Sequence, residues 1–293
     1  MIENIEKNMI ENIEKKENIN LAQYSTMKTG GIGKIVYSPK NHLEVLQILK
    51  SYGEENCFVL GNGSNVLFPD KNFNKILISL KHFDKFKVCD SVVIVGAGLN
   101  LFKLNNLLCQ NNLSGLEWSF GIPGTIGGLV YMNGGSFGSE ICQFVKEILV
   151  IEDQKLKRIK REDINFEYRS SNLKNVIILQ IKLCLTKSNK ETILKNMTNF
   201  FNIKKEKQPC DFPSLGSVFK INFDKEIVYP AKLIDNLGLK GVKIGGAEIS
   251  QKHAGFIVNS NHATSKDVLD LVEFVEQKAK ENGVTLKREI IVL

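Results

Sequence analysis

Residues 115–138, GLEWSFGIPGTIGGLVYMNGGSFG, hold eight of the 23 glycines of this 293-residue chain. Glycine adopts positive φ readily and lets a ligand approach bare backbone N–H groups. A loop dense in glycine can present several of these donors to one anion, as phosphate-binding nests do. Leu129–Tyr131 predicts a short strand after the first glycine turns. Taken alone, the stretch fits two interpretations equally well: a cradle for a phosphate-bearing ligand, or tight turns in a loop that connects two elements.

A second glycine turn, Gly61-Asn-Gly-Ser-Asn65, follows the expected helix His42–Tyr52 and strand Cys57–Leu60. A strand–helix–strand run that ends in a glycine turn is a common setting for phosphate binding. GNGSN lacks the spacing of G-x-G-x-x-G, however, and Gly96-Ala-Gly98 lacks the third glycine of that pattern. A Walker motif is also missing. We therefore expect any nucleotide to be held outside a Rossmann crevice.

Composition narrows the class of protein. The hydrophobic content of 43% and charged content of 24% are typical of a soluble globular chain, and the length suits two or three domains. No apolar run approaches the roughly 20 residues that cross a bilayer. Six cysteines without a C-x-x-C pair argue against a zinc site or a disulfide framework and predict a reducing, cytoplasmic setting. We expect no metal site. The net charge of +7 suits a small anionic ligand. We expect no nucleic-acid or membrane partner, and a monomer.

The first 20 residues contain a repeat, because MIENIEK at Met1–Lys7 recurs at Met9–Lys15. This charged, aromatic-free segment predicts a disordered extension or a frayed helix. Hydrophobic periodicity predicts the elements that follow it. We expect helices at 101–111, 192–207, 231–237 and 266–282, and strands at 34–38, 92–95, 146–151, 176–185, 244–249, 256–259 and 290–293.

Several motifs together resemble one family, the UDP-N-acetylenolpyruvoylglucosamine reductases (MurB), in its shorter type. The matching motifs run in the family's order from about Tyr24 to the C-terminus, and this order is far more specific than any single motif. They are GNGSN at 61–65, SGLEWSFGIPGTIGG at 114–128, MNGGSFG at 132–138, YRSS at 168–171, PSLGSVFK at 213–220, LKGVKIGGAEIS at 239–250, HAGFIVN at 253–259 and LKREIIVL at 286–293.

The resemblance implies an α+β fold. It combines an FAD-binding, vanillyl-alcohol-oxidase-like (PCMH-type) fold of two subdomains with a C-terminal α/β substrate-binding domain. After the extension 1–20, the expected boundaries are 21–84, 85–190 and 191–293. The family is an NADPH- and FAD-dependent UDP-N-acetylmuramate dehydrogenase. It reduces the enolpyruvyl ether of UDP-N-acetylglucosamine enolpyruvate in peptidoglycan synthesis.

The resemblance also assigns roles to residues. Arg169 suits the substrate carboxylate, because a guanidinium pairs with it in a bidentate way. Glu289 faces the enolate, best as a protonated donor, and Ser217 gives a proton to carbon. Without the resemblance, Arg169 would be interpreted as a surface charge and Glu289 as an exposed ion-pair partner of Arg288. Ser217 would be interpreted as a turn residue. The other implied contacts are, for FAD, Gly61, Asn62, Gly63, Ser64, Asn65, Gly121, Ile122, Pro123, Gly124, Thr125, Gly127 and Gly128, and, for substrate, Tyr168, Lys207, Lys220 and His253.

One position departs from the family pattern. Ile221-Asn222 stands where members carry Asn or Arg followed by Pro. A polar contact with the substrate is therefore either missing or supplied by Asn222 or Lys220.

Two other classes of protein compete with this interpretation. Gly134–Gly138, GGSFG, fits the G-x-S-x-G nucleophile elbow of an α/β-hydrolase, and Asp153 and His253 follow in the right chain order. That interpretation leaves the motifs at 61–65, 168–171 and 213–220 unexplained. A flavin-binding protein without turnover is the other class. Yellow colour on purification separates a flavoprotein from a hydrolase, and substrate-dependent NADPH oxidation separates an enzyme from a binder.

Overall fold

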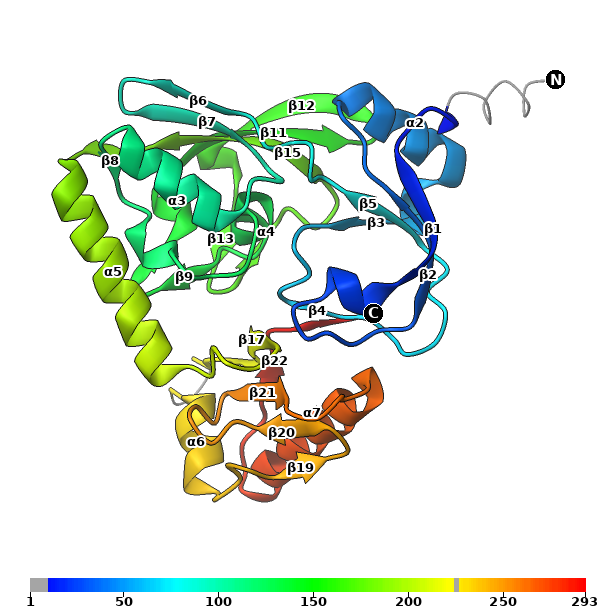
Figure 1. Cartoon of the computed structure of the whole chain (residues 1–293), viewed down its shortest axis with the longest axis vertical. Coiled ribbons are helices and arrows are strands. Elements are labelled where there is room, and N and C mark those ends of the chain that lie inside the picture. The colour runs from blue at the N-terminus through cyan, green and yellow to red at the C-terminus, as the bar shows by residue number, and fades with distance from the viewer. Residues whose placement is uncertain (1–9, 224–226) are drawn as a thin grey trace. The chain divides into compact units, whose positions relative to one another are not determined.

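The computed structural model describes residues 10–223 and 227–293, which divide into two compact units (Figure 1). The first unit comprises residues 10–19, Lys34–Asn62 and Asn74–Asn202. The second comprises Asn20–Gly33, Gly63–Phe73 and Ile203–Leu293. Neither unit is one continuous stretch of chain. The boundaries expected at 84/85 and 190/191 stay predictions.

A four-stranded sheet begins the first unit, in the order β1-β2-β5-β3. Its central strand β5 runs parallel to β2 and to β3, and all of its residues are buried. Helix α2 (His42–Tyr52) connects β2 to β3, and Asn41 caps it by accepting from the backbone N–H of Glu44. The helix begins and ends as the sequence predicted. The strands are β1 (Lys15–Asn20), β2 (Ile32–Tyr37), β3 (Cys57–Leu60) and β5 (Ile76–Ser79).

A five-stranded antiparallel sheet forms the rest of the first unit's framework, in the order β12-β11-β15-β7-β6. Helix α4 (Ile126–Tyr131) packs on β15 and β7, and α3 (Leu101–Gln110) follows β7 along the chain (Figure 1). Apolar side chains of both elements join one core with Val93, Val95 and Ile181. The strands are β6 (Phe86–Cys89), β7 (Val92–Gly96), β11 (Val145–Glu152), β12 (Lys155–Lys160) and β15 (Ile177–Cys184).

Short strand pairs shape the loops of the first unit. Two hairpins, β9–β10 and β13–β14, carry motifs that the sequence analysis singled out. The boundary between the units at 202/203 falls within the long helix α5 (Lys190–Lys207). The short strands are β8 (Leu113–Ser114), β9 (Gly135–Ser136), β10 (Ser139–Glu140), β13 (Phe166–Glu167), β14 (Ser170–Ser171) and β16 (Thr186–Lys187).

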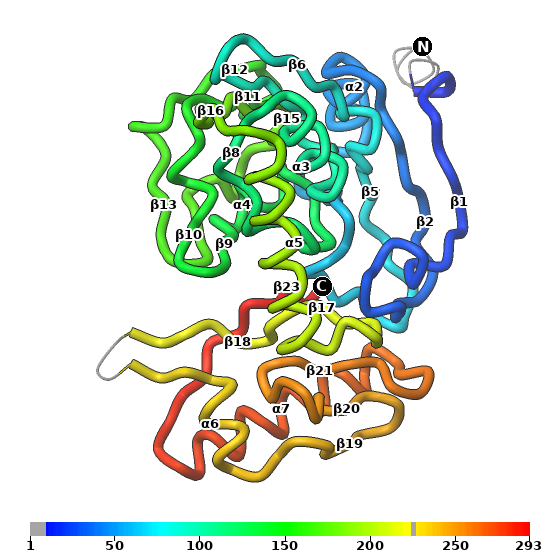
Figure 2. The backbone as a smooth tube through the Cα atoms, turned by 60° about the vertical axis from the view of Figure 1, so that its left-hand side comes forward, coloured from blue at the N-terminus to red at the C-terminus, as the bar shows by residue number. Residues whose placement is uncertain are grey.

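The second unit is a four-stranded sheet, in the order β17-β21-β20-β19, with α7 (Ser265–Glu281) packed along it (Figure 2). Val268, Leu271, Val272 and Val275 form the buried face of α7, as their helical spacing predicted. Met27 and Leu67, from far earlier in the chain, share this core. The remaining elements are β4 (Val66–Leu67), β17 (Ser214–Ser217), β18 (Phe219–Lys220), α6 (Pro230–Asn236), β19 (Lys243–Ile244), β20 (Ala247–Ile249), β21 (Phe256–Asn259), β22 (Lys287–Arg288) and β23 (Ile291–Val292).

Three local expectations differ from the structure. Leu129–Tyr131 lies in helix α4, because Thr125 caps the helix and Ile126, Leu129 and Val130 are buried at helical spacing. Residues 244–249 form a hairpin rather than one strand, since Gly245 turns the chain with φ +53°. In the expected disordered extension, Lys15–Asn20 is strand β1, with Ile10, Ile13 and Ile19 buried. The rest of that expectation, residues 1–9, lies outside the described residues.

Candidate functional site

The two glycine stretches meet in the first unit. The Asn62 side-chain amide donates to the Pro123 carbonyl at 2.5 Å, across 61 positions of sequence. A Cβ placed on Gly61 would lie 2.8 Å from the Thr125 hydroxyl oxygen, so only glycine fits this approach. Gly61, Gly121 and Gly128 are exposed. The adjacent turns thus present bare backbone at one surface.

A third loop, Gly96–Leu99, holds the long glycine stretch in place. The backbone N–H groups of Gly127 and Ile126 donate to the carbonyls of Ala97 and Leu99, at 2.9 and 3.0 Å. A Cβ on Gly127 would meet the Ala97 Cβ at 2.8 Å. In the sequence, Gly96-Ala-Gly98 stands out only as an incomplete Rossmann pattern. In the structure this loop holds the start of α4. That role is visible only from the proximity of the two segments in the fold.

The second half of the GNGSN turn, Gly63–Asn65, belongs to the second unit. Gly63 has φ +59°, and a Cβ there would lie 1.8 Å from the Tyr24 carbonyl oxygen. The Asn65 side chain donates to the Glu289 carbonyl at 3.0 Å, and the Ile291 N–H donates to the Asn65 carbonyl at 2.9 Å. Asn65 therefore fixes the segment that carries an expected catalytic residue.

Ser217 and Glu289 are brought together in the second unit. Ser217 ends β17, opposite Phe256 of β21. The Glu289 N–H donates to the carbonyl of Val218, the residue after Ser217, at 2.7 Å. Both residues are half-buried. Arg288 pairs with Glu276 of α7 through two contacts of 2.6 Å, which anchors the strand before Glu289.

Arg169 lies in the first unit, in the turn of the β13–β14 hairpin, with φ +53°. Its Nη2 donates to the Gly135 carbonyl at 2.7 Å, and its Nη1 lies 3.5 Å from Glu140 Oε1. The guanidinium carbon is 4.7 Å from the centre of the Tyr168 ring. Only 16% of the side chain is exposed, which is far from an ordinary surface arginine. The expected pair Tyr168 and Arg169 thus forms one stacked group.

The other expected substrate contacts lie in the second unit on different elements. Lys207 is the exposed last residue of α5, and Lys220 pairs with Lys287 across β18 and β22. His253 accepts the Gly255 N–H at Nδ1, 3.2 Å away, and its ring packs edge-on against Phe256. Burial lowers the pKa of His253. Asn222, beside Ile221, exchanges two backbone hydrogen bonds with Val228.

The hydrolase alternative loses its structural basis. A nucleophile elbow needs a strand before the serine and a helix after it. Here helix α4 precedes GGSFG, and Ser136 pairs with Ser139 inside the β9–β10 hairpin. Asp153 lies in the turn between β11 and β12 with φ +48°.

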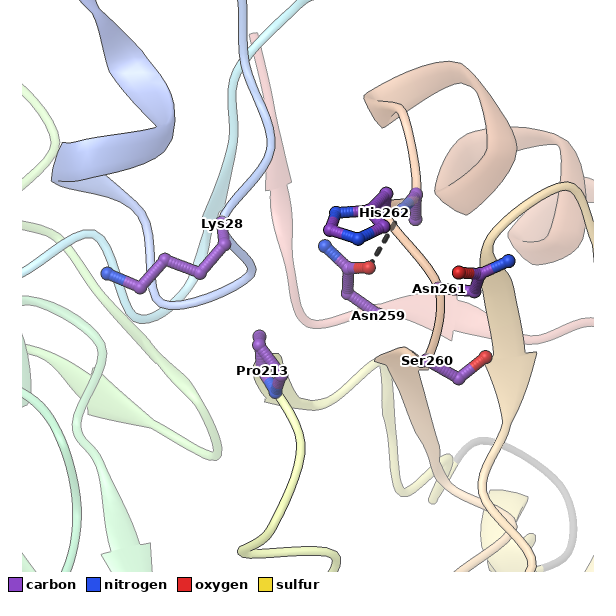
Figure 3. Close-up of a pocket in the computed structure, with 7 residues that line it drawn as sticks. Lys28, Pro213, Asn259, Ser260, Asn261 and His262 are labelled. Carbon is purple, nitrogen blue, oxygen red and sulfur yellow. Dashed lines mark hydrogen bonds between the residues drawn. The ribbon is translucent and has the colours of Figure 1, made fainter.

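A cavity of about 430 Å³ opens in the second unit (Figure 3). Its lining holds none of the expected site residues. Asn259 holds the loop beside it, because its side chain donates to the Met27 carbonyl at 3.1 Å and accepts the Ala263 N–H at 2.8 Å. The lining residues are Lys28, Pro213, Asn259, Ser260, Asn261, His262 and Ala263.

Residues 10–223 and 227–293 lack two kinds of feature. They contain no cluster of three or more His, Cys, Asp or Glu side chains that could hold a metal ion. They also contain no helix that is both long and apolar enough to cross a membrane.

Comparisons with known proteins match both parts of the chain. Residues 33–154 match the family model of the FAD binding domain, and residues 208–293 match that of the UDP-N-acetylenolpyruvoylglucosamine reductase C-terminal domain. The reductase of Thermotoga petrophila is 37% identical over 92% of this chain and 95% of its own length. That of Clostridium novyi is 36% identical over 98% and 94%. The crystal structure of MurB from Thermus caldophilus matches with a TM-score of 0.81 and 32% identity, over 96% of this chain and 98% of that one.

Proposed function

Because the chain belongs to the UDP-N-acetylenolpyruvoylglucosamine reductase family of FAD-dependent oxidoreductases, we propose that it uses NADPH to reduce UDP-N-acetylglucosamine enolpyruvate. The product is UDP-N-acetylmuramate, a precursor of peptidoglycan. The observation that carries the proposal is the backbone hydrogen bond from the Glu289 N–H to the carbonyl of Val218, the residue after Ser217.

FAD, when bound, supplies the hydride chemistry of the reaction. The residues that fit it lie at 61–62 and 121–128, where Gly61, Asn62, Gly121, Pro123 and Gly128 are exposed and a side chain in place of Gly61 would collide with Thr125. Backbone N–H groups in such turns suit a pyrophosphate. We propose that Gly63, Ser64 and Asn65 complete these contacts. The absence of His and Cys from both turns supports non-covalent binding.

In the proposed mechanism, Arg169 binds the carboxylate of the enolpyruvyl group. Negative charge builds up on the carbon next to this carboxylate as the double bond is reduced. A fixed guanidinium stabilises such charge without reorganising at the moment of reaction. Its 16% exposure and its contact with Tyr168 support a site that is already ordered.

The second unit carries Ser217 and Glu289, whose proposed roles are to supply the proton and to stabilise the enolate. The reduction adds a hydride to the terminal carbon and a proton to its neighbour, and we assign that proton to the Ser217 hydroxyl. Glu289 donates a hydrogen bond to the enolate. Tyr168, Lys207, Lys220 and His253 are proposed substrate contacts. The six free thiols fit the reducing cytoplasm in which we place a monomeric enzyme.

The test measures NADPH oxidation by the purified, flavin-loaded protein with and without the enolpyruvyl UDP-sugar. UDP-N-acetylglucosamine, which lacks the enolpyruvyl group, is the matched control. We expect oxidation that depends on the enolpyruvyl group. If the protein is yellow but oxidises NADPH at the same low rate with either sugar, it binds flavin without this activity.

A further inference from the structure

We propose that Glu140, held by Asn133, is a positioning residue for the Arg169 guanidinium. This inference rests on the role given to Arg169 in the proposed function. In this inference, the Glu140 carboxylate on a neighbouring hairpin orients that guanidinium.

The β9–β10 hairpin supplies two acceptors for the Arg169 guanidinium. Gly135 and Glu140 are paired across this hairpin. The Gly135 carbonyl accepts from Nη2 at 2.7 Å, and Glu140 Oε1 lies 3.5 Å from Nη1. A Cβ on residue 135 would lie 2.8 Å from the Glu140 Cγ, so glycine leaves room for the glutamate side chain.

Asn133 fixes the other end of the Glu140 carboxylate. Its Nδ2 donates to Glu140 Oε2 at 2.9 Å and to the Glu167 carbonyl at 3.0 Å. Its Oδ1 accepts the Cys142 N–H at 3.3 Å. Asn133 is 1% exposed, so both ends of its amide are held inside the fold. Glu140 therefore connects a donor held inside the fold to the Arg169 side chain.

Positioning matters here because Arg169 stands in a two-residue turn. An arginine side chain has several freely rotating bonds, and ordering them costs conformational entropy. Contacts made before the substrate arrives reduce that cost and fix the direction of the N–H fork. Misplacing a group by about 1 Å can slow a reaction roughly 10²-fold.

The chemistry of Glu140 makes glutamine a sharp substitute. The carboxylate accepts from Arg169 with one oxygen and from Asn133 with the other. A glutamine amide has one acceptor oxygen, and its NH₂ group would face a donor in either orientation. Glu140→Gln thus keeps the size of the side chain but can keep only one of the two contacts.

The test follows flavin absorbance by anaerobic stopped flow in flavin-loaded protein. We expect Glu140→Gln to slow reoxidation by the enolpyruvyl UDP-sugar about 10- to 100-fold, because the carboxylate-binding group is misplaced. Reduction by NADPH should stay at the parent rate. Glu167→Gln is the control, since it removes the same charge from an exposed residue of the hairpin that carries Arg169. Unchanged reoxidation in Glu140→Gln would overturn the inference.

A double-mutant cycle separates positioning from general damage. In an Arg169→Ala background, Glu140→Gln should have no further effect on reoxidation. An equal effect in both backgrounds contradicts the inference, because the glutamate would then act without the arginine. If Arg169→Ala itself leaves reoxidation at the parent rate, the proposed role of Arg169 fails instead. If Glu140→Gln loses FAD, the same test is made with Glu140→Asp. This variant keeps the negative charge but moves it away from Arg169 by the length of one methylene.

Discussion

Ser217 and Glu289 owe their proximity to one backbone hydrogen bond, from the Glu289 N–H to the Val218 carbonyl. Gly216, with φ +78°, turns the chain just before Ser217, and no heavy atom lies within 4 Å of a Cβ placed there. The glycine is therefore kept for its conformation and not for close packing. Replacing the Ser217 hydroxyl should leave this backbone arrangement intact.

Ser217→Ala should separate the two halves of the reaction. FAD should still bind, and NADPH should reduce the flavin at close to the parent rate. Reoxidation by the enolpyruvyl UDP-sugar should slow by at least about 10²-fold, the lower end of what a positioned general acid contributes. Anaerobic stopped-flow absorbance measures each half separately.

Ser217→Cys is the companion variant, because a thiol is a stronger acid than a hydroxyl. It should retain more activity than Ser217→Ala. In Ser217→Ala, slower reduction of the flavin with normal reoxidation would show that the role assigned to Ser217 is wrong. Equal slowing of both half-reactions in Ser217→Ala would indicate that Ser217 is a structural turn residue.

The site could be predicted from sequence only where motifs carry it. Arg169, Ser217 and Glu289 came from family order, since each alone reads as an ordinary surface or turn residue. Glu140 gave no signal, and Asn133 stood only inside the MNGGSFG motif with no role, because the contacts from Asn133 to Glu140 and from Glu140 to Arg169 exist only in the folded chain. Asn65 was expected to serve the cofactor, but its contact with the Glu289 carbonyl depends on a pairing 224 positions away.

At the scale of elements, the capping box of α7 offers a measurable contribution to stability. Asp267 accepts the N–H groups of Thr264 and Gly246 at 2.9 and 3.2 Å, and the Thr264 hydroxyl accepts the Asp267 N–H at 3.0 Å. The backbone hydrogen bond from Thr264 is the main cause that lowers the pKa of Asp267. The negative charge also suits the positive end of the helix dipole.

Asp267→Ala should lower the free energy of unfolding by about 1 kcal/mol at pH 7, as losing a cap does. Because the pKa of Asp267 is lowered on folding, this stabilisation is complete above the unfolded pKa of about 3.9. It is lost as the pH falls through the lower folded-state pKa. Urea unfolding at pH 7 and at pH 3 should show the difference shrinking. Asp270→Ala, which breaks only an exposed i,i+4 pair, should cost less than about 0.5 kcal/mol.

The N-terminal segment gives a second prediction for an element. Removing residues 1–8, so that the chain starts at Met9, should leave FAD content and activity unchanged. Removing residues 1–20 should lower the free energy of unfolding by on the order of 5 kcal/mol, because β1 and three buried isoleucines are lost. Thermal unfolding of both variants measures this. Equal melting temperatures would show that β1 adds nothing to the sheet.

Glu14 supports the second truncation result. Its carboxylate contacts Lys81 and His82, which lower its pKa to about 2. The second copy of the MIENIEK repeat, which contains Glu14, is thus joined to the rest of the first unit by side chains, and the strand β1 that begins at its last residue adds strand pairing.

Elements with clear periodicity were predicted well, and short apolar runs were not. The capped helix His42–Tyr52 and the apolar face of α7 follow directly from residue spacing. Leu129–Tyr131 is too short for periodicity to separate strand from helix. Its helical state is decided by the Thr125 cap and by the core against β15 and β7.

At the scale of the whole molecule, the second unit is built from three separate stretches of chain. Its core contains Met27 and Leu67 beside residues from Leu215 onward. Strand β23 pairs in parallel with β4, and the Asp70 carboxylate accepts two N–H groups at the start of α7, at 2.7 and 2.8 Å. The part of the chain that matches the C-terminal family model is therefore only part of a folding unit.

The fragment 203–293 alone should not fold cooperatively, because it lacks β4, Met27 and Asp70. Circular dichroism and urea unfolding of the fragment measure this, with the full chain as the control. A sigmoidal transition with near-native helix content in the fragment would refute the expectation.

The pairing of β23 with β4 also bears on how the protein is made. A ribosome adds about 5–20 residues per second. Asn65 and Glu289 are 224 positions apart, so β4 leaves the ribosome on the order of ten to forty seconds before its partner exists. During that time Val66 and Leu67, which end up 8% and 1% exposed, stay uncovered on the nascent chain. Slowing translation of the last hundred codons should therefore lengthen the time for which trigger-factor-like chaperones hold this chain.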